Sequence, residues 1–220
     1  MVADVPKPLA PVSNRPFITY LIDHWVDQGI KDFVFLLHFE AAQIEATINK
    51  LSVDPKFSEI SFRSVCEEKA LGTGGAVLHA IGELEIRDSF LVANADTWLG
   101  SGVQVLSMQP PCALAAVKVP NTQRYGSLGF SENKISSFEE KSDSMGEGYV
   151  NSGLYHLTPN IFDGFKTGDE FSLEEDIFPK LVYLSRLGFV KLDSSFIDIG
   201  IPTDYSRFCK WIELGKNNVI

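Results

Sequence analysis

RPFITYLIDHWVDQGIKDFVFLLHF (Arg15–Phe39) is the stretch of sequence that indicates the fold class most directly. Apolar side chains recur at helical spacing up to Gly29, a residue type that suits the left-handed conformation at the end of a helix. The apolar run Asp32–Phe39 follows at once. The pattern predicts an amphipathic helix over Arg15–Gly29 that leads into a buried strand.

The same alternation continues through the first half of the chain. We expect strands at Ile60–Glu67 and Phe90–Asp96, with helices at Glu40–Leu51 and Gly75–Leu84 between the strands. Helices of this length between strands imply right-handed parallel crossovers. The first half is therefore predicted to be doubly wound.

The second half has a mixed character. Its expected strands are Cys112–Val119, Ser127–Phe130, Lys134–Glu140, Tyr149–Leu157 and Phe196–Ile199. A capping box at Ser172–Glu175 predicts a helix through Ser185 with Gly188 at its C-cap, and Pro202 begins a last helix. The predicted fold class is α/β, with a mainly parallel sheet flanked by helices and antiparallel additions in the second half.

Composition limits the class of protein. The 220 residues are 45% hydrophobic and 22% charged, as in a folded globular protein, and one domain is the default at this length. The net charge of −10 predicts no general attraction to nucleic acid or to an anionic membrane. No apolar run approaches a membrane span, and Met1–Pro11 lacks the features of a signal peptide. The scattered cysteines Cys66, Cys112 and Cys209 favour a reducing cytoplasm.

Two aspartates are candidate metal ligands. Asp96 ends an otherwise apolar strand, where open α/β sheets bind ligands, and Asp198 lies within an apolar run that would bury it. Burial of a carboxylate is costly unless it is paired or binds a cation. Each aspartate alone fits a helix cap or turn equally well, but together they favour Mg²⁺.

The other candidates are a glycine-rich segment and several polar side chains. Leu71-Gly72-Thr73-Gly74-Gly75 follows a strand and opens a helix, so its backbone N–H groups suit an anion or a base edge, although a simple βα turn needs glycine too. Lys7 and Lys141 are candidate phosphate contacts or solvated lysines. Asn151 and Ser152 suit a sugar hydroxyl or a turn. Nucleophilic catalysis has no support in the sequence.

The order of six motifs resembles that of the sugar-phosphate nucleotidyltransferases, also called sugar-nucleotide pyrophosphorylases. The motifs are Pro6–Val12 with Arg15–Phe17, Leu71–Gly75, Asn94–Thr97, Phe138–Lys141, Asn151–Tyr155 and Phe196–Gly200. Within the family, the chain is most similar to guanylyltransferases that act on heptose 1-phosphate or mannose 1-phosphate. The resemblance implies a Rossmann-like fold of the nucleotide-diphospho-sugar transferase type.

The resemblance also implies a reaction and a set of roles. GTP and a sugar 1-phosphate would give GDP-sugar and pyrophosphate with Mg²⁺, by in-line attack on the α-phosphate. By match to the family, Asp96 and Asp198 hold the metal, Lys7 contacts phosphate and Lys141 holds the sugar phosphate. Leu71–Gly75 binds base and ribose. The sugar pocket is lined by Gly126, Glu140 and Asn151.

The chain departs from the family pattern in two places. The family begins with a strand and a G-G-x-G-T-R loop for the triphosphate, whereas Met1 of this sequence comes after that loop. We therefore expect a single domain over residues 1–220 that lacks this strand. The missing loop is expected to weaken guanylyl transfer. The missing strand is expected to reduce stability, because it leaves two apolar strands, Phe33–Leu37 and Phe90–Ala95, each without one neighbouring strand. Ala95 replaces the usual glycine, which is expected to crowd the backbone beside Asp96.

Two other function classes remain for comparison. The same fold also serves as a non-catalytic subunit that binds a nucleotide or a sugar phosphate, and this class predicts binding without release of pyrophosphate. A nicotinamide-dependent oxidoreductase requires G-x-G-x-x-G after the first strand, and the sequence has no such motif. The oligomeric state is not indicated by the sequence.

Overall fold

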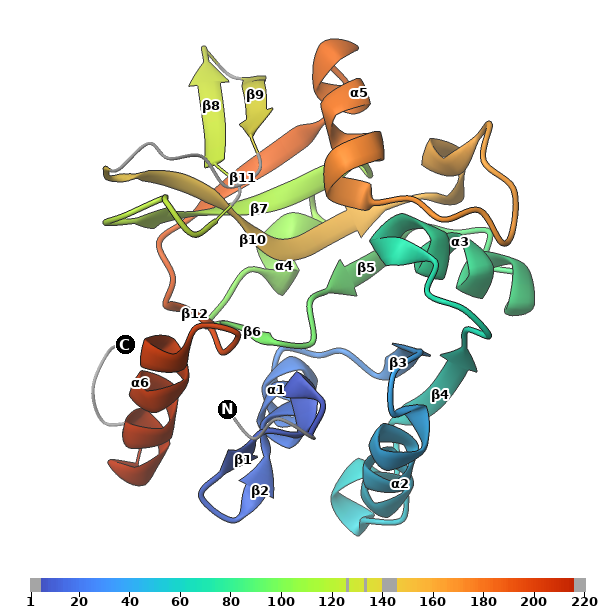
Figure 1. The fold of residues 1–220 in the computed structure, drawn as a ribbon, viewed down its shortest axis with the longest axis vertical. Coiled ribbons are helices and arrows are strands. Elements are labelled where there is room, and N and C mark those ends of the chain that lie inside the picture. Colours follow the sequence, from blue (N-terminus) through green and yellow to red (C-terminus); the bar gives the residue numbers. More distant parts are fainter. Residues whose placement is uncertain (1–4, 126, 133, 140–145, 216–220) are drawn as a thin grey trace. The chain divides into compact units, whose positions relative to one another are not determined.

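The computed structural model describes residues 5–125, 127–132, 134–139 and 146–215. They form two compact units (Figure 1). Unit 1 contains the described residues up to Ala70 and those from Ile197 onward, and unit 2 contains those of Leu71–Phe196. The chain therefore leaves unit 1, builds unit 2 and returns to unit 1.

Unit 1 is built from a parallel strand pair and three α-helices. Its elements are η1 (Lys7–Leu9), β1 (Pro11–Val12), β2 (Arg15–Pro16), α1 (Phe17–Asp27), β3 (Asp32–Leu37), α2 (Ala41–Ser52), η2 (Pro55–Phe57), β4 (Ser61–Cys66) and α6 (Pro202–Glu213). Strand β12 (Phe196–Asp198) crosses the boundary between the two units along the chain. Strands β3 and β4 pair in parallel with α2 as their crossover, as the alternation predicts.

The core of unit 1 joins α1 and α2 to the strand pair. Ile18 and Ile22 of α1 pack with Leu37 of β3 and with Ile44 and Ile48 of α2. Each of these two helical pairs is spaced by four residues, about one helical turn. Helix α2 buries this single apolar stripe, which confirms the predicted amphipathic helix, whereas α1 is buried at every position from Phe17 to Ile22 and is exposed only towards its end, at Asp27.

Helix α6 is joined to α1 by aromatic contacts. The fully buried ring of Phe208 meets Phe17 edge-to-face at 4.9 Å between centroids and Tyr20 at 6.0 Å. Tyr205 of the same helix donates a hydrogen bond to the carbonyl of Pro11. The last helix is thus part of the unit that the first seventy residues build.

Asp23 forms ion pairs with Arg15 and Lys56, and we predict that these pairs make the free energy of unfolding depend on pH. Its carboxylate accepts from Arg15 Nη2 at 2.8 Å and from Lys56 Nζ at 2.5 Å. Burial by itself raises the pKa of Asp23, but the two cations outweigh burial and lower the pKa below its ordinary value of 3.8. A lowered pKa stabilises the fold above the unfolded-state pKa, and this stabilisation is lost as the pH falls through the folded-state pKa.

Asp23→Asn is therefore expected to lower the free energy of unfolding by about 1 kcal/mol at pH 7, with the difference from wild type shrinking below about pH 4. Urea denaturation at several pH values measures the difference. Asp27→Asn, at an exposed position at the end of the same helix, is the control and should change stability by less than about 0.5 kcal/mol. An equal loss in both variants, or no pH dependence, would contradict the prediction.

Unit 2 is a mixed sheet with helices on both faces. Its elements are α3 (Gly72–Glu83), β5 (Phe90–Ala93), β6 (Thr97–Leu99), α4 (Val103–Ser107), β7 (Ala113–Val119), β8 (Ser127–Ser131), β9 (Lys134–Glu139), β10 (Gly148–Leu157), η3 (Pro159–Phe162), the π-helical turn η4 (Leu173–Ile177), α5 (Phe178–Tyr183) and β11 (Gly188–Leu192). The strand order is β11-β7-β10-β8-β9, with β5 also paired to β10. Strands β7 and β11 are parallel, and the other described pairs of this sheet are antiparallel.

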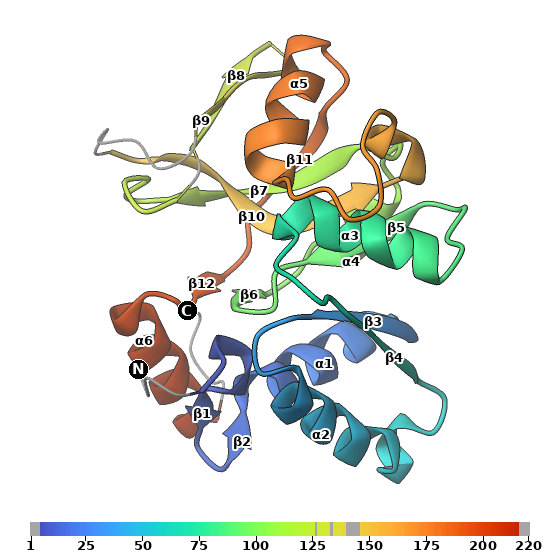
Figure 2. The same ribbon diagram turned by 45° about the vertical axis from the view of Figure 1, so that its right-hand side comes forward.

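Helices α4 and α5 cover opposite faces of this sheet (Figure 2). The rings of Phe138 and Tyr155 pack against Phe178 of α5 at 5.7 Å and 4.9 Å. On the other face, the turn before α4 is so close to the sheet that a Cβ on Gly102 would lie 2.5 Å from Leu192. The central strands are buried, with Leu114 fully inaccessible.

Strand β10 is irregular at its centre. Its register with β7 shifts between Asn151 and Tyr155, and Gly153 between them has φ +75°. A bulge of this kind turns side chains away from strict alternation. The bulge sets the directions of Asn151 and Tyr155, both of which belong to the candidate site.

Several element boundaries differ from those predicted. Helix α3 begins at Gly72 rather than Gly75, so the glycine-rich segment forms its first turn. Ser172 caps its helix as predicted, because its hydroxyl oxygen accepts the N–H groups of Glu174 and Glu175. The reciprocal bond differs from the predicted capping box, since the N–H of Ser172 donates to Asp176 instead of Glu175. This helix begins as a π-turn and ends at Tyr183, and Gly188 begins β11 instead of capping the helix.

Helices flanking a sheet confirm the predicted α/β class, but the prediction of a mainly parallel sheet is wrong for unit 2, where β7–β11 is the one parallel pair among the described strands because β10 pairs antiparallel with β5, β7 and β8. Within the described residues, β3 pairs only with β4, and β5 pairs only with β10 within unit 2. Phe33, Phe35 and Val92 on these strands are only partly buried. The single-domain interpretation of residues 1–220, and the strand expected to be missing from it, stay predictions.

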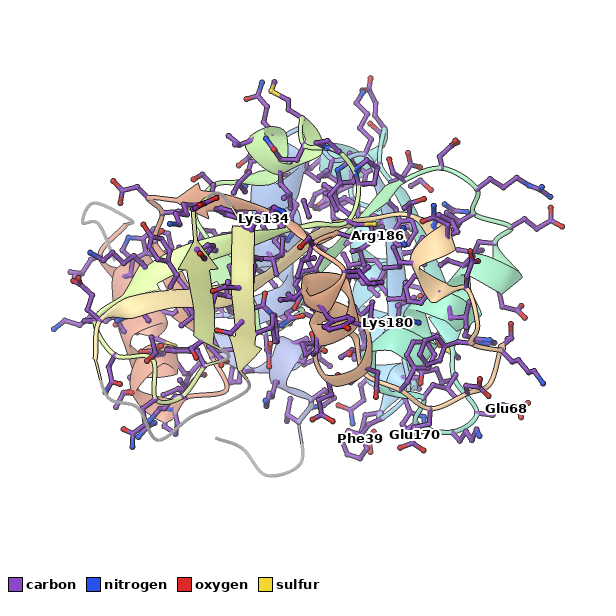
Figure 3. The ribbon with its side chains drawn as sticks, turned by 90° about the horizontal axis from the view of Figure 1, so that it is seen from above. Phe39, Glu68, Lys134, Glu170, Lys180 and Arg186 are labelled. Carbon is purple, nitrogen blue, oxygen red and sulfur yellow. The ribbon has the colours of Figure 1, made fainter. Side chains whose placement is uncertain are left out.

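The surface of unit 2 carries basic side chains although the whole chain is acidic. Figure 3 shows the face that carries α5 and the β8–β9 hairpin, with Lys134, Lys180 and Arg186 labelled on it. All three side chains are exposed.

In the described residues, no helix is long and apolar enough to span a membrane.

Candidate active site

Lys7 and Asp198 meet beside Gly200 in unit 1. A Cβ built on Gly200 would lie 3.0 Å from Lys7 Nζ and 2.9 Å from Asp198 Oδ1. The ammonium group and the carboxylate therefore face the same small space, although they come from opposite ends of the chain. Any side chain at position 200 would enter that space, so glycine keeps it open.

The local structure fixes both charged groups. Pro6 and Pro8 flank Lys7 at the start of η1, so two of the three backbone φ angles in this segment are restricted. Asp198 ends β12 and accepts the N–H of Gly200 at 2.8 Å. Its neighbours Ile197 and Ile199 are buried while Asp198 is half-buried, so it is less enclosed than the apolar run predicts.

Asp96 lies in unit 2, in the turn between β5 and β6. Its position just beyond the carboxyl end of β5 agrees with the sequence analysis. Thr97 Oγ1 lies 3.4 Å from Asp96 Oδ1. Ala95 is exposed and is not among the residues with positive φ, so its methyl group is accommodated without the expected crowding.

Gly153 brings the turn that holds Asp96 close to Asn151. The N–H of Asn94 donates to the carbonyl of Gly153 at 2.9 Å, and a Cβ on Gly153 would lie 2.6 Å from Asn94 Nδ2. The N–H of Gly153 in turn donates to Asn151 Oδ1 at 3.1 Å. The predicted sugar-pocket residue and the predicted metal turn are thus neighbours within unit 2.

The glycine-rich segment Leu71–Gly75 packs against Asp169–Phe171. The N–H groups of Gly74 and Gly75 both donate to the carbonyl of Phe171, at 3.0 and 3.2 Å. A Cβ on Gly74 would lie 2.4 Å from the Phe171 ring, and one on Gly75 would lie 2.4 Å from the Asp169 carbonyl. At Gly74 and Gly75 the need for glycine is therefore explained by close packing. Gly72 and Thr73 are exposed, but a Cβ on Gly72 would also lie 2.5 Å from the Phe171 carbonyl oxygen.

Glu174 is a residue that the sequence analysis missed as part of the site. Its carboxylate accepts three hydroxyl groups: Thr73 Oγ1 at 2.6 Å, Ser172 Oγ at 3.0 Å and Tyr155 OH at 2.9 Å. Tyr155 OH also accepts from Asn151 Nδ2 at 2.7 Å. We call these five residues the Glu174 network; the helices and strands that carry it can be followed in Figure 1.

The network holds its tyrosine as a proton donor. Burial, followed by the nearby Glu174 carboxylate, raises the pKa of Tyr155 well above its ordinary value. Tyr155 is fully inaccessible and stays protonated. In the sequence, Glu174 is part of the capping box. This local role already accounts for its residue type, so the sequence does not indicate its long-range contacts.

The Asp198 carboxylate suits Mg²⁺ better than it suits a metal ion whose ligands are all protein side chains. In the part of the chain that the structure describes, no group of three or more His, Cys, Asp or Glu side chains is placed to hold a metal. Mg²⁺ characteristically uses one or two carboxylates together with substrate phosphates and water. Asp198, half-buried beside Lys7, has the oxygen donors and partial exposure that such binding needs.

Three predicted residues, Gly126, Glu140 and Lys141, lie outside the described residues. Of the remaining predictions, unit 1 brings Lys7 and Asp198 together. Unit 2 brings Thr73 and Asn151 into one network, with the turn of Asp96 beside it. These placements agree with the predicted roles, which stay predictions.

Similarity to known proteins extends over nearly the whole chain. The family model for nucleotidyl transferases matches residues 2–213. The chain is 30% identical over 210 residues to D-glycero-alpha-D-manno-heptose 1-phosphate guanylyltransferase of Campylobacter jejuni, covering 94% of this chain and 91% of that protein. It is 28% identical to mannose-1-phosphate guanylyltransferase of Mycobacterium tuberculosis, covering 94% of this chain and 58% of that protein.

A solved structure agrees with these relatives. HddC from Yersinia pseudotuberculosis superimposes with a TM-score of 0.84 at 30% identity, covering 96% of this chain and 92% of HddC. The same protein complexed with GMP-PN superimposes with a TM-score of 0.82. The resemblance inferred from six motifs is confirmed, and the chain belongs to the nucleotidyl transferase family.

Proposed function

We propose that this chain transfers a guanylyl group from GTP to a sugar 1-phosphate of the heptose or mannose type, yielding GDP-sugar and pyrophosphate. The observation that carries the proposal is the meeting of Lys7 and Asp198 beside Gly200. A cation and a carboxylate in one open space suit a nucleoside triphosphate with its magnesium. The guanylyltransferase relatives support the choice of base and sugar.

The proposed reaction is a displacement at phosphorus. An oxygen of the sugar phosphate forms a bond to the α-phosphorus of GTP, and the bond from that phosphorus to the bridging oxygen breaks as pyrophosphate leaves with the electron pair. Asp96 and Asp198 are the proposed Mg²⁺ ligands, and Mg²⁺ would offset the charge that develops on the phosphate oxygens. Lys7 contributes a fixed positive charge to the phosphates of GTP.

The protein itself contributes mainly positioning. We assign base and ribose binding to the exposed part of Leu71–Gly75, and sugar binding to Asn151 with Gly126 and Glu140. Lys141 is assigned to the sugar phosphate. With the residues that the structure describes, the side chain of Asn151 makes two of its four possible hydrogen bonds, so donor and acceptor capacity remains for a sugar hydroxyl. The free thiols of Cys66, Cys112 and Cys209 agree with a cytoplasmic setting.

Release of pyrophosphate tests the proposal. The purified chain is incubated with each of GTP, ATP, CTP, UTP and dTTP, with mannose 1-phosphate or D-glycero-D-manno-heptose 1-phosphate, and with Mg²⁺ or EDTA. We expect release that requires GTP, one sugar phosphate and Mg²⁺. Lys7→Met should reduce kcat/KM at least about 10-fold, whereas Lys31→Met, which removes an exposed lysine paired with Glu59, should not.

Two other outcomes would change the assignment. Selective GTP binding in calorimetry without any pyrophosphate release would favour the non-catalytic binding subunit. Absence of binding of any nucleotide and of either sugar 1-phosphate by a chain with a folded circular-dichroism spectrum would contradict both functions.

A further inference from the structure

The Glu174 network contains one carboxylate among hydroxyl groups, and this fixes the direction of every bond. An ionised carboxylate only accepts hydrogen bonds, so Thr73, Ser172 and Tyr155 must all donate their protons to Glu174. Each hydroxyl has a single proton. None of the three can then donate to another group without giving up its bond to Glu174.

On one side of the network, this direction fixes an amide. Tyr155 OH has given its proton to Glu174 Oε1, so it can only accept from Asn151, and the Nδ2 of Asn151 must face it at 2.7 Å. The Oδ1 of Asn151 then accepts the N–H of Gly153 at 3.1 Å. The charge on Glu174 thus determines which end of the Asn151 amide faces each neighbour.

On the other side, the same carboxylate fixes the first turn of α3. Thr73 Oγ1 donates to Glu174 Oε2 at 2.6 Å and accepts the N–H of Leu173 at 2.9 Å. The proton of the hydroxyl and one of its two lone pairs are therefore used inside the protein. Thr73 ties the exposed part of the glycine-rich segment to the start of η4, and its side chain is committed to holding the loop.

We propose that Glu174 is a positioning residue that sets both substrate subsites, the nucleotide loop through Thr73 and the sugar-binding Asn151 through Tyr155. The inference rests on the proposed function, which assigns those two subsites. Glu174 itself touches neither substrate; it acts through two hydroxyl groups. Loss of its charge therefore affects two Michaelis constants by separate routes.

Glu174→Gln changes the charge and leaves the side-chain size unchanged. If the new NH₂ group faces Tyr155, the tyrosine must accept it and redirect its own proton to Asn151, whose amide then turns over and loses Gly153. If the NH₂ group faces Thr73, the threonine proton loses its acceptor. Each orientation disturbs one of the two subsites, and a mixture disturbs both.

The test compares KM values for GTP and for the sugar 1-phosphate in pyrophosphate-release assays. Tyr155→Phe is expected to raise the KM for the sugar 1-phosphate about 10-fold and to leave that for GTP within about 2-fold. Thr73→Val should do the reverse. Glu174→Gln should raise the KM for the sugar 1-phosphate if its NH₂ group faces Tyr155, the KM for GTP if that group faces Thr73, and both if the two orientations are mixed. Where the sugar KM rises, adding Tyr155→Phe should raise it no further. A merely structural role would not split the two constants in this way.

Glu170→Gln is the matched control, because Glu170 is exposed and labelled at the edge of the molecule in Figure 3. It should change neither KM. If Glu174→Gln does not fold, Tyr155→Phe and Thr73→Val carry the test alone. Unchanged KM values, or equal shifts of both constants in all variants, overturn the inference while the proposed function stands. Absence of transfer by the wild-type chain overturns the proposed function and the inference with it.

Discussion

Asp198→Asn should lower kcat/KM for guanylyl transfer by at least about 100-fold, which corresponds to roughly 2.7 kcal/mol of transition-state stabilisation. The asparagine keeps the size of the side chain and can still accept the N–H of Gly200, so the fold of unit 1 should persist. What disappears is the negative charge that faces Lys7 and would bind Mg²⁺. Pyrophosphate release over a magnesium titration measures the loss.

The control is Asp193→Asn, which removes an exposed carboxylate near the end of β11 and should leave the rate within about 2-fold of wild type. Thermal denaturation of both variants separates loss of activity from loss of structure. Unaltered magnesium dependence in Asp198→Asn would refute its assignment as a metal ligand. The same experiment on Asp96→Asn tests the second proposed ligand independently.

Gly72→Ala is expected to produce the largest loss of stability among the glycine substitutions in unit 2, about 2 to 4 kcal/mol. Gly72 has φ +71°, and an added Cβ would lie 2.5 Å from the carbonyl oxygen of Phe171. The substitution therefore combines an unfavourable backbone conformation with a clash against a backbone atom that cannot move by itself. The melting temperature should fall by about 5 to 10 °C.

Two other glycines separate these contributions. Gly168 has φ +92° with open space around it, so Gly168→Ala should cost about 1 kcal/mol, from the backbone conformation alone. Gly82 lies within α3 and would make only an ordinary 3.6 Å contact with Thr167, so Gly82→Ala should stabilise the chain by about 0.5 to 1 kcal/mol. Equal melting temperatures for the three variants would contradict the packing role of Gly72.

Local signals in the sequence predicted the helices and strands well, because periodicity and capping act over a few residues. Ser172 is an N-cap and Pro202 begins α6, as expected from their residue types. The start of α3 was placed three residues too late, because a run of glycines does not distinguish a loop from a helical first turn. The first turn is held by Phe171, a partner far along the chain that no local pattern identifies.

The residues of the candidate site also fall into two groups, those that the sequence could indicate and those that it could not. Lys7, Asp96, Asp198 and Asn151 could be singled out because charged or polar residues in apolar or rigid surroundings are unusual. Glu174 could not, since its place in a capping motif already accounted for it locally. Its contacts with Tyr155 and Thr73 depend on how β10, α3 and η4 meet, which is a property of the folded unit 2.

The discontinuity of unit 1 has a consequence for synthesis on the ribosome. Translation is vectorial, and domains fold as their residues emerge, at about 5 to 20 residues per second. Unit 2 is continuous from Leu71 to Phe196, so it is complete before unit 1, whose α6 emerges last. Until Phe208 arrives to cover Phe17 and Tyr20, the nascent first seventy residues leave an aromatic surface uncovered, and this is the stage at which a chaperone has most to protect.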